Sequence, residues 1–103
     1  MTPSSWTKQP NEVRQLELDV TNALSSGDSV ASVISCTVYD SSGTDVSASM
    51  ISGTATVSSN KLYVTVQAGT HNCYYWLEAK VYTSNGDTIE DDLKIIVKDT
   101  RLL

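Results

Sequence analysis

From Arg14 onward, apolar and polar residues alternate along the chain with a period of two, which predicts strands that each bury one face. A helical turn is expected only within residues 22–26, where Gly27 would end it. No helix is expected beyond residue 30, so the long crossovers that join parallel strands are missing. The pattern therefore predicts an all-β, seven-stranded antiparallel β-sandwich. The expected inward-facing residues of the seven runs are Leu16, Leu18 and Val20; Val30, Ile34, Cys36 and Val38; Val46, Ala48 and Met50; Ala55 and Val57; Leu62, Val64, Val66 and Ala68; Tyr75, Leu77, Ala79 and Val81; and Leu93, Ile95 and Val97.

Two hairpin turns set the expected register of neighbouring strands. Gly43 and Gly86 each stand third in a three-residue loop, a left-handed position where a side chain is penalised. The first turn, within residues 40–44, predicts Val38 opposite Val46, Cys36 opposite Ala48 and Ile34 opposite Met50. The second turn, within residues 83–87, predicts Tyr75 opposite Ile95, Leu77 opposite Leu93 and Lys80 opposite Glu90. It also leaves Asp91 pointing inward opposite Ala79, which a bulge or an exposed sheet margin would relieve.

The length of the chain fits one domain. Its 103 residues can form a single core without disulfides or metal. Residues 1–13 are polar, contain both prolines and lack periodicity, so we expect an extended N-terminal arm. Residues 14–99 would form the sandwich and residues 100–103 a C-terminal tail. The first residues lack the charged and apolar regions of a secretory signal, which indicates a protein made in the cytoplasm or a piece of a larger chain.

The net charge and the cysteine spacing limit the classes of partner and ligand that the chain could bind. The formal net charge is −5 and the seven basic residues are scattered, which argues against nucleic acid and anionic membranes as partners. The spacing of the two cysteines, Cys36 and Cys73, matches no metal motif. Two reduced, buried thiols and an inter-sheet bridge are both compatible with the sequence.

The sequence offers little reactive chemistry. His71 is the single histidine, the paired serines fall in predicted turns, and no Gly-x-Ser-x-Gly elbow occurs. The acids of the run 90–92 alternate between the two faces of one strand, which does not suit glycoside hydrolysis. A calcium site using Asp87, Glu90 or Asp92 matches no known loop spacing. We expect no catalytic residue, no cofactor and no metal.

The segment Gly69-Thr70-His71-Asn72-Cys73-Tyr74-Tyr75-Trp76-Leu77 resembles the start of the sixth strand in immunoglobulin-like and fibronectin type III domains. In those domains a tyrosine near the strand start bonds to the backbone across the corner. By alternation the matching residue here is Tyr75, because it shares a face with Leu77. The resemblance implies an immunoglobulin-like sandwich.

A second resemblance covers residues 6 to 98. The motifs that carry it, in order, are Trp6-x-Lys8-x-Pro10-x-Glu12, Leu18-Asp19-Val20, Leu24-x-x-Gly27-Asp28-x-Val30 and Thr83-Ser84-Asn85-Gly86-Asp87. The chain resembles small phage and prophage proteins that act as fibre–tail adaptors or head–tail accessory proteins. The resemblance implies a non-enzymatic virion structural protein, made in the bacterial host cytoplasm. Its partners would be tail, fibre or head–tail connector proteins, and it would be present in several copies, with homo-oligomers in the assembled particle.

Aromatic residues supply the candidate interface. Tyr74, Trp76 and Tyr82 alternate with the core positions of the sixth strand and so point outward, and Trp76 lies opposite Lys94, within reach of a cation–π contact. With Ile96 they would form a docking face, although aromatic residues also simply shield strands.

Two further alternatives stay open. Trp6 in the arm is a second candidate, packed on the sandwich or inserted into a neighbour. Exposed Trp and Tyr also stack on sugar rings, so a carbohydrate-binding or adhesin-type module is the competing function.

Overall fold

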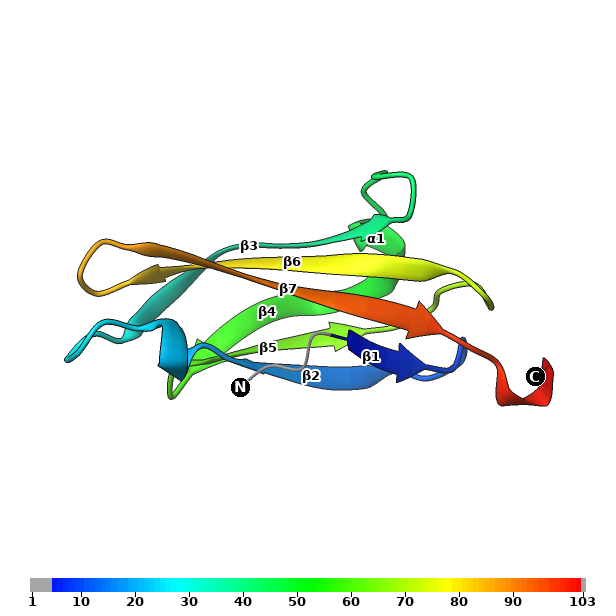
Figure 1. Cartoon of the computed structure of the whole chain (residues 1–103), viewed down its shortest axis with the longest axis horizontal. Helices are drawn as coiled ribbons and strands as arrows, with labels where there is room; N and C mark the ends of the chain where they lie inside the picture. Colours follow the sequence, from blue (N-terminus) through cyan, green and yellow to red (C-terminus); the bar gives the residue numbers. More distant parts are fainter. Residues whose placement is uncertain (1–4, 103) are drawn as a thin grey trace.

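The computed structural model describes residues 5–102, which form two β-sheets packed face to face (Figure 1). One sheet has four strands in the order β1-β7-β6-β3, and the other has three in the order β2-β5-β4. The prediction of an all-β chain in two packed sheets is confirmed, and the strands number seven, although β1 stands in place of the strand expected at residues 46–50. The elements are β1 (Ser5–Lys8), β2 (Arg14–Asp19), η1 (Thr21–Ala23), β3 (Val30–Asp40), α1 (Ser47–Met50), β4 (Ile51–Ser58), β5 (Lys61–Val66), β6 (Tyr74–Thr83), β7 (Thr88–Val97) and η2 (Thr100–Leu102).

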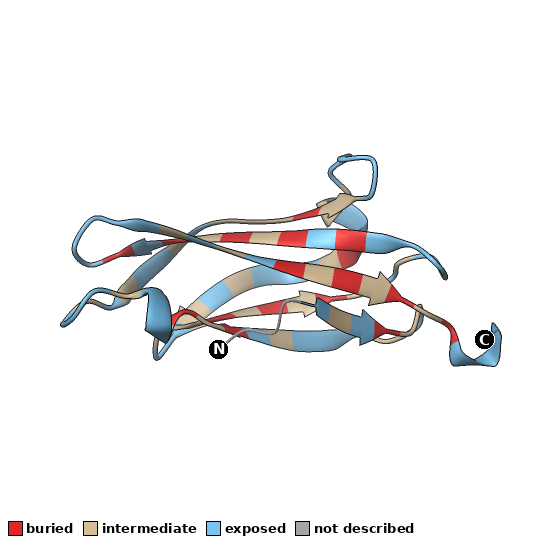
Figure 2. Cartoon of the chain, viewed as in Figure 1, coloured by how far each residue is buried: buried red, intermediate tan, exposed pale blue. Residues whose placement is uncertain are grey.

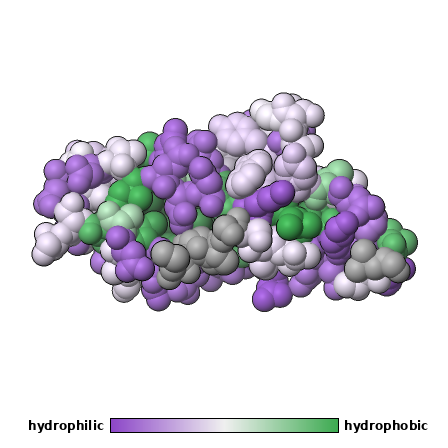
Figure 3. Space-filling view, viewed as in Figure 1, coloured by the Kyte–Doolittle hydropathy of each residue, from purple (hydrophilic) through white to green (hydrophobic). Residues whose placement is uncertain are grey.

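The core lies between the sheets and follows the alternation of the sequence. Buried and more exposed residues alternate along β6 and along the second half of β7 (Figure 2). Each fully buried Leu, Ile or Val stabilises the fold by roughly 1.5–3 kcal/mol. Figure 3 shows the resulting surface in one view, largely hydrophilic with separate hydrophobic patches. The buried apolar residues are Leu18, Val20, Val38, Met50, Leu62, Val64, Val66, Tyr75, Leu77, Ala79, Val81, Leu93, Ile95 and Val97.

The β6–β7 hairpin has the predicted register. Leu77 lies opposite Leu93, and the backbone N–H of Thr83 donates to the Asp87 carbonyl at 2.9 Å to close the three-residue loop. Gly86 has a φ of 90°, a conformation that favours glycine. Asp91 does lie opposite Ala79, and it is half-buried beside η1 at the margin of the sheet.

The first strand corrects the prediction of a wholly antiparallel sandwich. β1 pairs in parallel with β7, so residues 5–8 of the expected arm belong to the four-stranded sheet. The backbone N–H of Lys98 donates to the Lys8 carbonyl at 2.9 Å and extends this pairing. A parallel neighbour was missed because its partner lies at the far end of the chain. Residues 1–4 of the expected arm and residue 103 of the expected tail lie outside the described residues, and residues 100–102 form η2.

The segment after Gly43 also differs from the prediction. Gly43 has a φ of 86°, and the Val46 N–H donates to the Val38 carbonyl at 2.8 Å, so the turn itself forms. Residues 47–50 then form the helical turn α1 rather than a strand, with the Met50 N–H donating to the Val46 carbonyl at 3.1 Å. The expectation of no helix beyond residue 30 is therefore wrong. Val46 and Met50 are four residues apart, so a helical turn directs both inward as well as a strand does.

Two register shifts in β3 overturn the inward assignment of Ile34. The shifts fall between Val30 and Ser32 and between Val33 and Ser35, and each inserts one residue that has no partner on β6. Ile34 is the second inserted residue, and it is 50% exposed. The alternation resumes at Cys36, which lies opposite Ala79. A bulge changes which face the following residues occupy, and the sequence carried no mark of it.

Candidate functional site: the outer face of the four-stranded sheet

The face of the four-stranded sheet that points away from the core carries three exposed aromatic side chains. Tyr74, Trp76 and Tyr82 are 40%, 42% and 45% exposed, respectively. They share this face because they lie an even number of residues apart on β6. Ile96 lies directly opposite Tyr74 and is half-buried. We call these four residues the outer aromatic face.

The predicted cation–π pair forms with a different ring. Lys94 lies opposite Trp76 in the register, yet its Nζ stands 4.5 Å from the centroid of the Tyr74 ring. The lysine leans one rung along the sheet, which leaves Trp76 exposed between Lys94 and Tyr39 on the neighbouring strands. The contact stabilises the position of Tyr74 by about 0.5–1 kcal/mol at such an exposed site.

An acidic triad lies on the next rungs of the same face. Glu78, Glu90 and Asp92 each bring a carboxylate oxygen within 4.8 Å of the others. Glu78 faces Asp92 directly across the hairpin, and like charges in that position destabilise a sheet. Lys80 lies opposite Glu90 as predicted, but its ion pair is with Glu78, at 3.4 Å.

The crowding of the triad changes the acidity of Asp92. Loss of solvent around its carboxyl group, a hydrogen bond shared with Glu90 and repulsion from neighbouring carboxylates raise the pKa of Asp92 to about 6. Although the residue is exposed, this carboxyl group therefore keeps its proton up to about pH 6 and is mostly ionised at pH 7 and above. Within residues 5–102, this is the one group of three or more His, Cys, Asp or Glu residues close enough to share a cation.

Trp6 lies apart from the outer aromatic face. It pairs with Ile95 in the parallel register of β1 and packs, half-buried, against the hydrophobic core. The structure thus brings onto one outer face the residues Tyr74, Trp76, Tyr82 and Ile96. It places Trp6 on the inner face of the same sheet, toward the core. Of the two arrangements open for Trp6, this is packing on the sandwich.

Tyr75 anchors the corner where the chain enters β6. Its side chain is buried, and its hydroxyl oxygen accepts a hydrogen bond from the Thr70 backbone N–H at 3.0 Å. Gly69, with a φ of 96°, lies under the ring, and a Cβ there would stand 2.7 Å from the Val97 side chain. This corner holds the backbone at the start of β6 against the core. It thereby fixes the positions of Tyr74 and Trp76 on the outer face.

The comparison with known families matches this chain to the model described as podophage GP4 fibre-tail adaptor protein gp77, over residues 8–96. The chain belongs to this family of phage fibre-tail adaptors. The match covers both sheets from the end of β1 almost to the end of β7, including the whole outer aromatic face. No curated protein matches the chain.

The lysine of the first sequence motif, Lys8, is buried and holds the start of the adaptor fold, a role that the motif alone did not reveal. Lys8 is 1% exposed, and its Nζ donates to the carbonyls of Gln9 at 2.6 Å, Pro10 at 3.2 Å and Ala68 at 2.6 Å. Burial lowers the pKa of Lys8, and the charge of Glu12 partly offsets this effect. Glu12 also accepts the Gln9 N–H at 2.7 Å. The Lys8-x-Pro10-x-Glu12 motif therefore forms a loop that is held by hydrogen bonds from Lys8 and to Glu12. The sequence signal that could have shown the burial of Lys8 is its position two residues after Trp6, on the same face of a strand.

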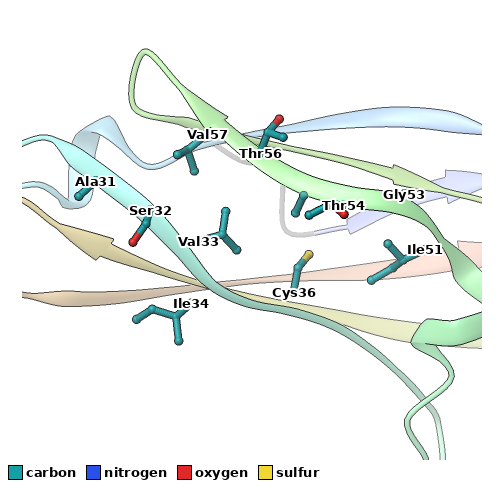
Figure 4. Close-up of a pocket in the computed structure, with 11 residues that line it drawn as sticks. Ala31, Ser32, Val33, Ile34, Cys36, Ile51, Gly53, Thr54, Thr56 and Val57 are labelled. Atoms are coloured by element: carbon teal, nitrogen blue, oxygen red, sulfur yellow. The ribbon is translucent and has the colours of Figure 1, made fainter.

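A groove opens between the edges of the two sheets at β3 and β4. It has a volume of about 660 Å³, and no charged residue lines it. Figure 4 shows Val33 and Cys36 pointing toward β4 and Ile34 pointing away. Burial raises the pKa of the Cys36 thiol to about 11. Both cysteines are free thiols, with Cys73 exposed.

The single histidine, His71, has a structural partner in the fold. His71 Nδ1 accepts the Asp99 backbone N–H at 2.8 Å. Asp99 is buried and binds Arg101 through both carboxylate oxygens. These contacts secure the segment that leads into η2. Among the described residues, no helix is long and apolar enough to cross a membrane.

Proposed function

We propose that this chain is a non-enzymatic phage or prophage virion structural protein that joins tail and fibre proteins during assembly. The family match over residues 8–96 carries this proposal. The chain is made in the host cytoplasm and enters the virion in several copies, where it contacts other virion proteins and other copies of itself. The role needs surfaces for other proteins and no reacting groups.

We infer that the sandwich is an immunoglobulin-like variant. The order β7-β6-β3 corresponds to the three-strand sheet of that fold, and β2-β5-β4 corresponds to three strands of its second sheet. The Tyr75 hydroxyl, bonded to the backbone of Thr70, has the form of the corner found at the start of the sixth strand. β1 joins the sheet of β7 instead of the sheet of β2.

We propose the outer aromatic face as the docking surface of the adaptor. Trp and Tyr contribute strongly to protein–protein interfaces because they cover a large area with few rotatable bonds. Tyr74, Trp76 and Tyr82 hold such area on a rigid, hydrogen-bonded hairpin. Trp6 contributes to the core and is not part of this surface.

The test is binding of the purified chain to virions of the encoding phage assembled without it. Trp76→Ser should abolish binding, because it removes the largest exposed ring, while the melting temperature stays within a few degrees of wild type. Tyr63→Ser is the matched control, since Tyr63 is a half-buried aromatic on the outer face of the other sheet. Wild-type binding by Trp76→Ser would refute the docking face. A glycan array run in parallel would favour a carbohydrate-binding module if Trp76-dependent signals appeared without virion binding.

A further inference from the structure

We propose that the partner of the outer aromatic face presents an arginine or lysine side chain, which enters the acidic triad while an apolar group of the same partner covers Trp76. This inference rests on the proposed docking face and deepens it by stating the chemistry of the partner. It follows from the order of residues along the β6–β7 hairpin.

The aromatic and acidic groups are adjacent rungs of one ladder. Trp76 pairs with Lys94, and two residues further along β6 the pair is Glu78 with Asp92. Rungs on one face of a sheet are separated by about 7 Å, twice the rise per residue. A cationic partner side chain in the triad therefore lies one rung from Trp76, close enough for an apolar group of the same partner to cover the ring.

The triad contains more negative charge than its neighbours neutralise. The charged groups on the same face beside it are Lys80 on β6 and Lys94 on β7, and the facing residues of β3, Thr37 and Ser35, are uncharged. Asp91 points to the opposite face of β7, so it supplies no positive charge to the triad. Lys80 is paired with Glu78, and Lys94 lies over Tyr74. A partner cation between the carboxylates would relieve their mutual repulsion, which is the same repulsion that helps to raise the pKa of Asp92 to about 6.

The outer face of the other sheet lacks this combination. There Glu17 forms an ion pair with Lys61 at 2.8 Å, so its charge is already matched within the chain. Large exposed aromatic side chains are also found on β6 rather than on β2, β4 or β5. Apolar area and unmatched negative charge therefore coincide on the outer aromatic face, and this complementarity selects a cationic partner.

The experiment measures binding of the purified chain to virions assembled without it, over a range of salt and pH. The double variant Glu90→Gln with Asp92→Asn removes two charges without changing side-chain shape. The matched control, Glu17→Gln with Asp87→Asn, removes two charges outside the triad. The triad variant should bind about tenfold more weakly or worse, and the control should bind within about twofold of wild type.

Wild-type binding should weaken as salt rises and as the pH falls from 8 to 5, and the triad variant should show a flatter response to both. If the triad variant binds like wild type while Trp76→Ser does not, the cationic partner is wrong and the docking face stands. If neither variant changes binding, the docking face falls as well. A rise in melting temperature with Ca²⁺ that the triad variant loses would assign the triad to a metal ion and overturn the inference.

Discussion

Lys8→Met isolates the contribution of the buried ammonium group to the fold. Methionine retains most of the apolar stem and its packing but offers no donor. Three carbonyl oxygens, those of Gln9, Pro10 and Ala68, would lose their Nζ hydrogen bonds of 2.6, 3.2 and 2.6 Å. The substitution therefore releases both the loop after β1 and the segment that leads into β6.

The expected loss follows from the cost of leaving buried acceptors unpaired. Each lost hydrogen bond to a charged donor costs about 1.5–3 kcal/mol. Removing a buried charge returns part of this cost, because the ammonium group no longer has to be desolvated. Water can also replace the donor at Pro10, which lies only half-buried. The net loss should be about 2–4 kcal/mol, which lowers the melting temperature of a domain of this size by about 10–25 °C.

Thermal and urea unfolding followed by circular dichroism would measure the effect. Lys61→Met is the matched control, since Lys61 forms one surface ion pair with Glu17 and its loss should cost less than about 1 kcal/mol. Lys8→Arg should lie between wild type and Lys8→Met, because a planar guanidinium cannot direct its donors as an ammonium does. A Lys8→Met melting temperature within about 3 °C of wild type would show that the three hydrogen bonds contribute nothing net.

Three further changes test the corner and the acidic triad by the same unfolding measurements. Tyr75→Phe should cost about 1–3 kcal/mol, because the Thr70 N–H loses its acceptor; no loss would mean that the corner bond is dispensable. Gly69→Ala should cost about 2–4 kcal/mol, since a Cβ would stand 2.7 Å from Val97 at a φ of 96°. Asp92→Asn should stabilise the fold by roughly 0.2–1 kcal/mol at pH 8. The folded-state pKa of Asp92 is raised to about 6, so its charge destabilises the fold above pH 6, and this penalty fades as the pH falls toward 4. The stabilisation by Asp92→Asn should therefore be smaller at pH 4 than at pH 8, and equal stabilisation at both would contradict the raised pKa.

The β6–β7 hairpin was predictable because two independent signals agree. Alternation places Leu77 and Leu93 on the buried face, and the glycine in the turn at Gly86 selects a three-residue loop. Only one register satisfies both signals, and the outward direction of Trp76 follows from it. The residues of the proposed docking face were therefore accessible from the sequence.

Two features between Val30 and Met50 were not predictable, for a physical reason. Each inserted residue of β3, Ala31 and then Ile34, reverses the direction of the side chains that follow, so the two cancel at Cys36, and neither position has a glycine or proline to mark it. Alternation over Val46, Ala48 and Met50 fits a short strand, but Val46 and Met50 also fit one helical face. A hint was present in Asp45, whose carboxylate accepts the Ser47 N–H at 2.9 Å and favours a turn there.

The inner side chains of the hairpin hold the outer aromatic face in place, a stability that its own residues do not supply. A slip of one residue in β6–β7 would bring Lys94 opposite Leu77, so burial of the inner side chains prevents the slip. The same constraint keeps Trp76 one rung from Glu78 and Asp92 on the outer side. Substitutions on the outer side should therefore change binding with little change in stability. Substitutions at inner positions such as Leu77 should reduce both together, because they loosen the hairpin that holds the aromatic and acidic groups in place.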